Sequence, residues 1–251
     1  EAPLASTADR VSSIDSLRAL TMLLMIFVND LWSLKDIPLW LEHVPADADG
    51  MGLADTVFPA FLFIVGMSIP LAIAARRKKG DSQLQLLQHI LVRTMALLVM
   101  GLFLVNGENI NAAATGISRA LWNTLSCTSF ILIWNVYPKN MQQTLKRALQ
   151  GIGIAILLTL AFLYKGGEDG NLTGFSTWWW GILGLIGWCY FTASMITAFA
   201  GKQKFLIVGP WLVFVTLSLF STAGLLPQGS LLSVIPSPII GGTLVALTLG
   251  G

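Results

Sequence analysis

Long apolar segments recur along the sequence and limit the fold more than any other feature. A helix needs about 20 mainly apolar residues to cross a membrane, and the segments lack the period-two alternation of barrel strands. We therefore predict an all-α fold, a polytopic transmembrane helix bundle with about 7–8 spans. Seven are expected at Ser16–Trp32, Thr56–Ala75, His89–Val105, Gly116–Tyr137, Leu149–Tyr164, Thr177–Ala200 and Phe205–Leu226, with an eighth from about Ser230 to Gly251.

The amino-acid composition also indicates an integral membrane protein. Only 11% of the residues are charged and 55% are hydrophobic, whereas about 25% of a soluble domain is charged. The net charge of +2 is small and the basic residues lie in short loops, so no nucleic-acid partner is expected. Cys127 and Cys189 lie in separate apolar segments without the His and Cys spacing of a zinc site. We expect both to be small buried side chains, and we predict no metal site.

The organisation of the chain is simple. It contains no repeat and no linker, so residues 1–251 are expected to form a single transmembrane domain. The sequence begins at Glu1 and ends inside the apolar segment IIGGTLVALTLGG. We therefore expect a longer parent protein, C-terminally incomplete here, with an unspecified number of helices after Gly251.

The charges of the loops predict the orientation of the helices. Basic residues gather in every second loop, most densely at ARRKKGDSQ after the second predicted span. The alternate loops hold Lys35 and Lys165, each among acidic residues. Because cytoplasmic loops carry the excess of Lys and Arg, the N-terminus is predicted to be cytoplasmic. The loop that contains His43 is then on the outer face.

Two polar pairs lie at the ends of the first span, where a membrane helix tolerates them only with a partner or a function. Asp15 and Arg18, three residues apart, share a helix face and can pair. They form either a structural ion pair at the cytoplasmic interface or part of a site. Asn29 and Asp30, in MIFVNDLW, are either a simple polar helix end or site residues.

Two further charged residues lie near the outer ends of later spans. Asp55 begins the second span, where the helix dipole favours a carboxylate, so it is either a helix-end residue or a site residue. Arg119, in TGISRALWNTL, is expected about one turn inside the fourth span. An arginine at that depth needs an anion, and Asp55, Glu108 or a ligand are the candidates.

Three consecutive tryptophans, Trp178–Trp180, are expected just inside the outer end of the sixth span. Tryptophan is enriched at membrane interfaces. An aromatic belt is therefore the favoured interpretation over a platform that stacks a sugar.

His43 is the residue on which the functional prediction depends. The sequence has two histidines, and His89 opens the third span beside the basic loop, where we interpret it as interfacial. His43 follows IPLWLE and precedes an acidic stretch at the mouth of the second span. A histidine titrates near neutral pH and can accept or donate a proton. His43 is therefore a candidate general base.

The N-terminal half of the sequence resembles a known enzyme family. RVSSIDSLRALTMLLMIFVND, then LEH, then DGMGLADTVFPAFLFIVGMSI are similar to the heparan-α-glucosaminide N-acetyltransferase family, and closest to its bacterial relatives. Downstream, VNGENI and GISRALW resemble the same family, and the resemblance is specific over about residues 10–137. The matching positions include Asp15, Arg18, Asn29, His43, Asp55, Asn106 and Arg119.

The resemblance implies a transmembrane acyltransferase that takes acetyl-CoA from the cytosol and acetylates an amino sugar or glycan on the outer face. The membrane would be a bacterial inner membrane, with the His43 loop facing the periplasm. His43 would be the central catalytic residue, either as acetyl carrier or as general base. Asn29 would orient the imidazole or hold the thioester oxygen, and Asp55 would fix the histidine tautomer.

The other polar residues of the pattern are expected to bind substrate or cofactor. Arg119 could pair with a CoA phosphate or with an acidic sugar. The lipid bilayer is the remaining predicted partner, and a homo-oligomer is left open. The expected binding residues are Arg119, Asp30, Asn106, Glu108, Asp15 and Arg18.

Two other functions fit the same residues. A transporter or flippase for a sugar or glycan would also place Arg119 and acidic residues along a substrate path. A non-catalytic membrane protein would use its polar residues only to pair with one another. An acetyltransferase should bind acetyl-CoA and release CoA, which a transporter should not do.

Overall fold

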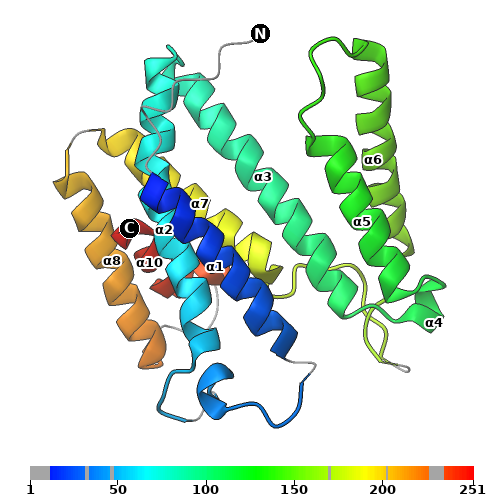
Figure 1. Cartoon of the computed structure of the whole chain (residues 1–251), viewed down its shortest axis with the longest axis horizontal. Helices are drawn as coiled ribbons and strands as arrows, with labels where there is room; N and C mark the ends of the chain where they lie inside the picture. Colours follow the sequence, from blue (N-terminus) through cyan, green and yellow to red (C-terminus); the bar gives the residue numbers. More distant parts are fainter. Residues whose placement is uncertain (1–11, 32–33, 46–47, 169–170, 202, 226–234) are drawn as a thin grey trace. The chain divides into compact units, whose positions relative to one another are not determined.

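Helices form nearly all of the regular structure in the part of the chain that the computed structural model describes (Figure 1). That part comprises residues 12–31, 34–45, 48–168, 171–201, 203–225 and 235–251. Backbone pairing outside the helices there consists of two isolated bridges, Ile110 with Gly166 and Gly166 with Thr173. The predicted all-α, polytopic class is confirmed.

Each of the first seven predicted spans contains a helix. Six of these helices, in the described part of the chain, are long and apolar enough to cross a membrane. Their backbone hydrogen bonds are made internally, as the apolar interior of a bilayer requires. They are α1 (Ser12–Asp30), α2 (Leu53–Lys78), α3 (Gln83–Glu108), α6 (Gln143–Leu163), α7 (Gly181–Ala200) and α8 (Phe205–Thr222).

The helix in the fourth predicted span is shorter than expected. Helix α5 covers Arg119–Trp134, 16 residues, or about 24 Å against a hydrocarbon core of about 30 Å. It starts late because Gly116 ends the short helix α4 (Ala112–Thr115) in a left-handed conformation and the Ser118 side chain then caps α5. Arg119 is the first residue of α5, so the prediction that it lies one turn inside the helix is wrong.

The expected eighth span is broken where the structure describes it. Residues 235–251 contain two short helices, α9 (Ser237–Ile240) and α10 (Thr243–Gly250), whereas the expected residues 230–234 lie outside the described part. Gly242 lies between the two helices at φ +75°, a left-handed conformation that interrupts a right-handed helix. A continuous spanning helix over the described residues is therefore excluded.

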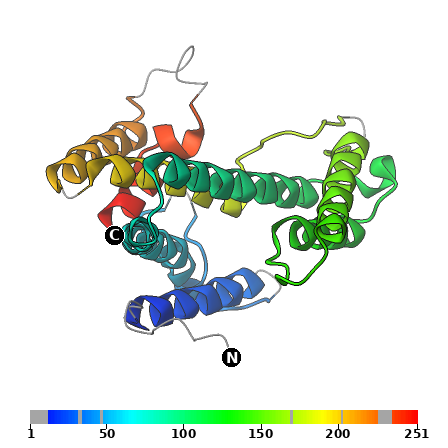
Figure 2. The same ribbon diagram turned by 90° about the horizontal axis from the view of Figure 1, so that it is seen from above.

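The chain divides into two compact units, whose boundaries fall within α3 and α7. The first unit comprises Glu1–Gln88 and Cys189–Gly251, and the second unit is His89–Trp188. In the first unit α1 and α2 pack side by side, as Figures 1 and 2 show, and α10 packs against both α2 and α8. The contact between α2 and α10 requires Gly66, because a Cβ there would overlap the carbonyl oxygen of Thr248.

The second unit is built on an aromatic core. Helix α5 packs along α6, and Trp122 of α5 is fully buried, with its indole donating to the carbonyl of Phe103 at 2.9 Å. Cys127, also in α5, is exposed, so the expected burial of both cysteines holds for Cys189 alone. The buried members of the core are Phe103, Trp122, Leu157, Leu160 and Tyr164.

A smaller apolar cluster in the first unit supports the candidate site. Val28 and Leu31 from the end of α1 meet Ala54 and Val57 from the start of α2, and all four are buried. We call these four residues the α1–α2 cluster. The end of α1 and the start of α2 meet at this cluster. The segment that joins the two helices therefore starts and finishes there.

Candidate active site

The segment between α1 and α2 carries His43 and folds back onto the α1–α2 cluster. A single 3-10 turn, η3 (Leu39–Leu41), lies in this segment, and Glu42 continues from it in an extended conformation. Ile37 and Leu41 pack, partly buried, against the cluster. Ile37 and Leu41 thus anchor the backbone that carries His43.

Asp55 organises the backbone around His43. It is the third residue of α2, whose N-cap is Gly52. Its Oδ2 accepts hydrogen bonds from the backbone amides of Gly52, at 2.9 Å, and Val44, at 3.1 Å. Its Oδ1 lies 2.6 Å from Nδ1 of His43. A carboxylate is favoured at a helix N-terminus, and this one also holds the histidine.

The contact with Asp55 determines which nitrogen of His43 can act as a base. An ionised carboxylate only accepts hydrogen bonds, so Nδ1 of His43 carries the hydrogen in this contact. In the neutral imidazole, Nε2 then bears the lone pair. The side chain of His43 is 49% exposed and that of Asp55 is 28% exposed. A substrate can therefore approach His43, and the hydrogen bond to Asp55 fixes the tautomer of its imidazole.

Gly52 brings the two sides of the site together. A Cβ at this position would overlap the carbonyl oxygen of Glu42, so any larger residue would separate the start of α2 from the segment that carries His43. The amide of Gly52 also donates to Asp55. Glycine is required here for close approach, because its φ of −88° is open to every residue.

A cavity of about 220 Å³ lies beside His43 in the first unit. Most of its described lining residues are apolar, and three of them belong to the α1–α2 cluster. Glu42 and His43 are the polar residues that line it. Among the residues that the structure describes, no three His, Cys, Asp or Glu side chains are grouped to hold a metal ion. The lining residues are Val28, Leu31, Leu34, Ile37, Leu41, Glu42, His43 and Ala54.

Asn29 and Asp30 end α1 near the cavity, but they do not line it. Both residues are exposed, whereas the adjacent Val28 is buried and forms part of the cavity wall. Between the residues that are described, no hydrogen bond joins Asn29 to His43 or Asp55. The contact that orients the imidazole is thus made by Asp55.

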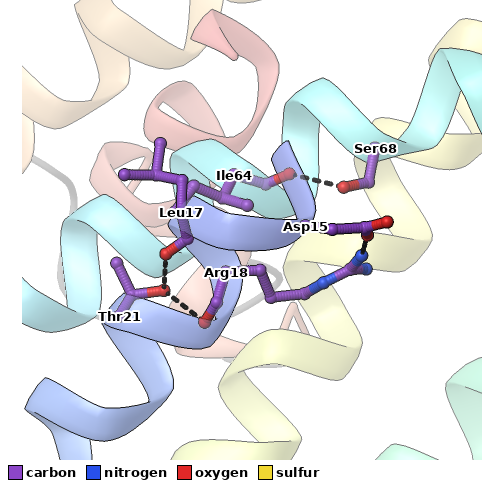
Figure 3. A network of polar contacts seen from close by, with 6 residues as sticks. All are labelled: Asp15, Leu17, Arg18, Thr21, Ile64 and Ser68. Carbon is purple, nitrogen blue, oxygen red and sulfur yellow. Dashed lines mark hydrogen bonds and ion pairs between the residues drawn. The ribbon is translucent and has the colours of Figure 1, made fainter. Parts of the chain in front are cut away.

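Asp15 and Arg18 form an ion pair in the first turns of α1, as their spacing predicts (Figure 3). Both side chains are partly exposed, and the Thr21 hydroxyl donates to the carbonyl of Arg18 at 2.9 Å. Asp15 and Asn29 are separated by about 20 Å along the helix axis. The ion pair is therefore distant from the end of α1 at which the His43 segment begins.

Asn106, in the second unit, is fully buried and makes four hydrogen bonds. Its side-chain amide donates to the carbonyls of Leu102, at 2.7 Å, and Ser176, at 2.8 Å. Its oxygen accepts from the backbone amide of Ser176 and from Nε1 of Trp178, at 3.3 and 3.1 Å. Both of its amide hydrogens are thus donated within the protein.

The tryptophans that Asn106 helps to hold precede α7 instead of lying inside it. Trp178 and Trp180 have φ of +45° and +72°, and α7 begins at Gly181. The prediction that the tryptophans lie within the sixth span is wrong, because the chain turns at these residues before the helix starts.

Arg119 and Glu108 are both exposed residues of the second unit. Glu108 is the last residue of α3 and Arg119 the first of α5, and the guanidinium is close enough for its charge to act on the carboxyl group. Of the anions considered for Arg119, Glu108 thus lies in the same unit, within reach of the guanidinium charge.

Sequence reasoning did not select three features of the His43 site: Glu42 in the cavity wall, the close contact at Gly52, and the backbone amide of Val44 that Asp55 binds. Glu42 could have been noticed because it directly precedes His43 in LEH. The glycines near His43 suggest room for a close backbone approach, but the partner of Gly52 and the role of the Val44 amide depend on how the backbone folds between α1 and α2.

The fold and the site are those of a polytopic membrane protein with a His–Asp pair at a helix entrance. The chain belongs to the family described as "Domain of unknown function (DUF5009)", which matches residues 10–228. It is also similar to proteins named heparan-alpha-glucosaminide N-acetyltransferase, from mouse (35% identical over 105 residues) and from human (34% over 107 residues). The resemblance predicted from the sequence is confirmed by these matches.

These matches cover only part of each protein. They include 40% and 41% of this chain, but 15% of the length of each relative. The chain thus shares a segment with these N-acetyltransferases.

Proposed function

We propose that this protein is a transmembrane N-acetyltransferase that moves the acetyl group of cytosolic acetyl-CoA to an amino sugar or glycan on the outer face of the membrane. The observation that carries the proposal is the 2.6 Å contact between His43 and Asp55 beside a cavity. The names of the mouse and human relatives support the same reaction class.

The reaction needs a base, which His43 supplies. An amine acceptor is mostly protonated at neutral pH, and its nitrogen attacks a thioester only after it loses a proton. Nε2 of His43 takes that proton, while Nδ1–H continues to donate its hydrogen bond to Asp55. The carboxylate of Asp55 stabilises the imidazolium. A carbon–nitrogen bond forms and the carbon–sulfur bond of acetyl-CoA breaks. The second proton of the nitrogen passes to the departing CoA thiolate, and His43 releases its proton to solvent.

A second route uses the same nitrogen as a carrier. Nε2 attacks the thioester and CoA leaves, which gives an acetyl-histidine. The amine then attacks this acetyl group and releases His43. This route suits a donor and an acceptor that approach from opposite sides of the membrane. A transient acetyl-histidine after rapid quenching would distinguish it from direct transfer.

Other residues are assigned supporting roles in the proposal. Asn29, in the last turn of α1, is proposed to donate to the thioester oxygen once a substrate is bound. Arg119 is proposed to contact an anionic group, either a CoA phosphate or an acidic sugar. The saturated hydrogen bonding of Asn106 favours a structural role for it instead of ligand binding.

We further propose that the protein resides in a bacterial inner membrane, with the His43 segment facing the periplasm. The basic residues after α2, Arg76, Arg77, Lys78 and Lys79, support this orientation because positive loops stay cytoplasmic. Acetyl-CoA would then reach the protein from the side opposite to the acceptor. Modification of a single introduced cysteine by a membrane-impermeant reagent, at Asp49 or at Lys79, would test this placement.

The experiment that tests the proposed reaction uses the full-length protein in detergent with radiolabelled acetyl-CoA and glucosamine. Native protein is expected to release CoA and form N-acetylglucosamine, whereas His43→Ala is not. Asp36→Asn, an exposed acid of the same segment, serves as the control and should behave as native. Absence of both CoA release and acetyl-CoA binding would overturn the proposal and favour a transporter.

A further inference from the structure

Glu42 brings a negative charge to the wall of the cavity beside His43. Among the residues that the structure describes, Glu42 and His43 are the polar ones that line the cavity. Glu42 itself is half-buried. A charge at an apolar wall interacts more strongly with an opposite charge than it would in water, because the local dielectric is lower. The cavity therefore suits a group with a positive charge.

The backbone of Glu42 is fixed by a hydrogen bond from its amide and by a close contact at its carbonyl. Its amide donates to the carbonyl of Leu39, at 3.3 Å, as the C-cap of η3. Its carbonyl lies against Gly52 so closely that no side chain fits there. The carboxylate is thus carried by a fixed backbone that is adjacent to the one that carries His43, and a ligand bound by Glu42 would be held next to the imidazole.

The other described acids of this segment lie outside the cavity wall. Asp36 and Asp49 are both exposed and lie in the same segment between α1 and α2, which also contains Lys35. Glu42 is thus the acid of this segment that acts at the cavity itself, and Asp36 and Asp49 provide matched controls.

We propose that Glu42 is the residue that receives the ammonium group of the acceptor and so selects a cationic primary amine as the substrate of this site. The inference rests on the proposed acetyl transfer and adds to it the residue that recognises the acceptor. Glu42 binds the ammonium, and His43 then removes its proton before attack. Glu42 is a positioning and specificity residue, because the proton and the acetyl group do not pass through it.

This role predicts that KM and kcat respond differently to loss of the charge. A carboxylate beside an ammonium favours binding but also keeps the proton on the amine, so its removal weakens binding without an equal loss of turnover. For Glu42→Gln, KM for the amine is expected to rise about fivefold, the size of a partly exposed charge pair. The KM for acetyl-CoA should change less than about twofold, because the donor does not bind at Glu42. The kcat should also change less than about twofold, because easier loss of the amine's proton opposes the loss of positioning.

The experiment measures KM for glucosamine and for acetyl-CoA with full-length native protein, Glu42→Gln, Glu42→Asp and the control Asp49→Asn. Glu42→Asp keeps the charge and should restore most of the affinity for the amine. Asp49→Asn removes one charge from the same segment, outside the cavity wall, and should behave as native. As a test that needs no variant, methylammonium should inhibit native protein at a lower concentration than methanol does.

The outcomes separate this inference from the proposed function. A higher KM for glucosamine in Glu42→Gln alone, together with inhibition by methylammonium, would support it. Transfer with an unchanged KM in Glu42→Gln, or an equal rise in Asp49→Asn, would overturn it while the acetyltransferase stands. If Glu42→Gln does not fold, equal inhibition by methylammonium and methanol overturns it. Absence of transfer by native protein would overturn both.

Discussion

His43 with Asp55 and Asn106 with Trp178 are two polar groupings in different units of the molecule, and they differ in what they leave accessible. The side chain of His43 is 49% exposed and borders a cavity. Asn106 is 0% exposed and gives both amide hydrogens to the protein. Sequence motifs selected both, but only the first can still engage a substrate.

The difference teaches how a polar residue in a membrane protein should be assigned. A buried amide must find partners because an unsatisfied polar group is costly, and Asn106 finds them in the turn before α7. Asp55 also accepts hydrogen bonds from two backbone amides, but its other oxygen contacts a histidine that borders a cavity. Burial and the partners of each atom therefore distinguish a structural polar group from a functional one.

The largest effect is expected at His43. Replacement by Gln keeps a polar side chain that can still bond Asp55 but removes the base. We expect kcat for acetyl transfer to fall about 1000-fold, within the range for loss of a general base, with little change in stability because the residue is exposed. Initial rates of CoA release together with thermal unfolding would measure both. A stable variant with a native rate would remove His43 from the mechanism.

Asn106→Ala should show the opposite behaviour. It leaves the polar groups of Ser176 and Trp178 without their partner, so the free energy of unfolding should fall by about 3 kcal/mol. The rate of the folded fraction at low temperature should stay close to native. Thermal unfolding in detergent measures the first quantity. A large loss of rate at unchanged stability would assign Asn106 to the active site and remove the contrast.

Asp55→Asn should lie between these two variants. An Asn amide can donate to Nδ1 of His43 and favour the tautomer with the hydrogen on Nε2, which cannot act as a base. We expect kcat to fall about 30-fold and stability to fall by about 1 kcal/mol, from the lost cap of α2. NMR of ¹⁵N-labelled histidine would report the tautomer. An unchanged tautomer with a native rate would contradict this role of Asp55.

The smallest effect is expected at Arg119. Because it is exposed at the start of α5, Arg119→Gln should change stability by less than about 0.5 kcal/mol. If its guanidinium contacts an anionic part of donor or acceptor, KM for that substrate should rise about threefold. Steady-state kinetics with each substrate varied in turn would identify which one. Unchanged KM values for both would exclude Arg119 from binding.

Much of the helical framework could be predicted from the lengths of the apolar segments, and the ion pair of Asp15 with Arg18 from their spacing. The errors occurred where local turn chemistry ends a helix. Gly116 and Ser118 delay α5 and place Arg119 at its first residue, although the residues around them are apolar enough to continue a span. Gly242 breaks the last apolar segment in the same way.

The candidate site was predictable in part. A histidine near a helix start and an aspartate in its first turn suggested themselves from the sequence, but their contact depends on backbone geometry. The amides of Gly52 and Val44 position Asp55, and the carbonyl of Glu42 needs the absence of a side chain at Gly52. The hydrogen bond from the Val44 amide arises from a backbone atom that every residue possesses and leaves no signature in residue types, whereas the close approach at Gly52 is marked only by the glycine itself.

The central claim is that His43 and Asp55 act as one catalytic unit, and a double-mutant cycle on acetyl transfer tests it most directly. The single variants His43→Gln and Asp55→Asn are compared with the double variant under the same conditions. If the two side chains work as a unit, the double variant should keep the residual rate of His43→Gln, because Asp55 acts only through the imidazole. Losses that multiply would show independent roles and contradict the account.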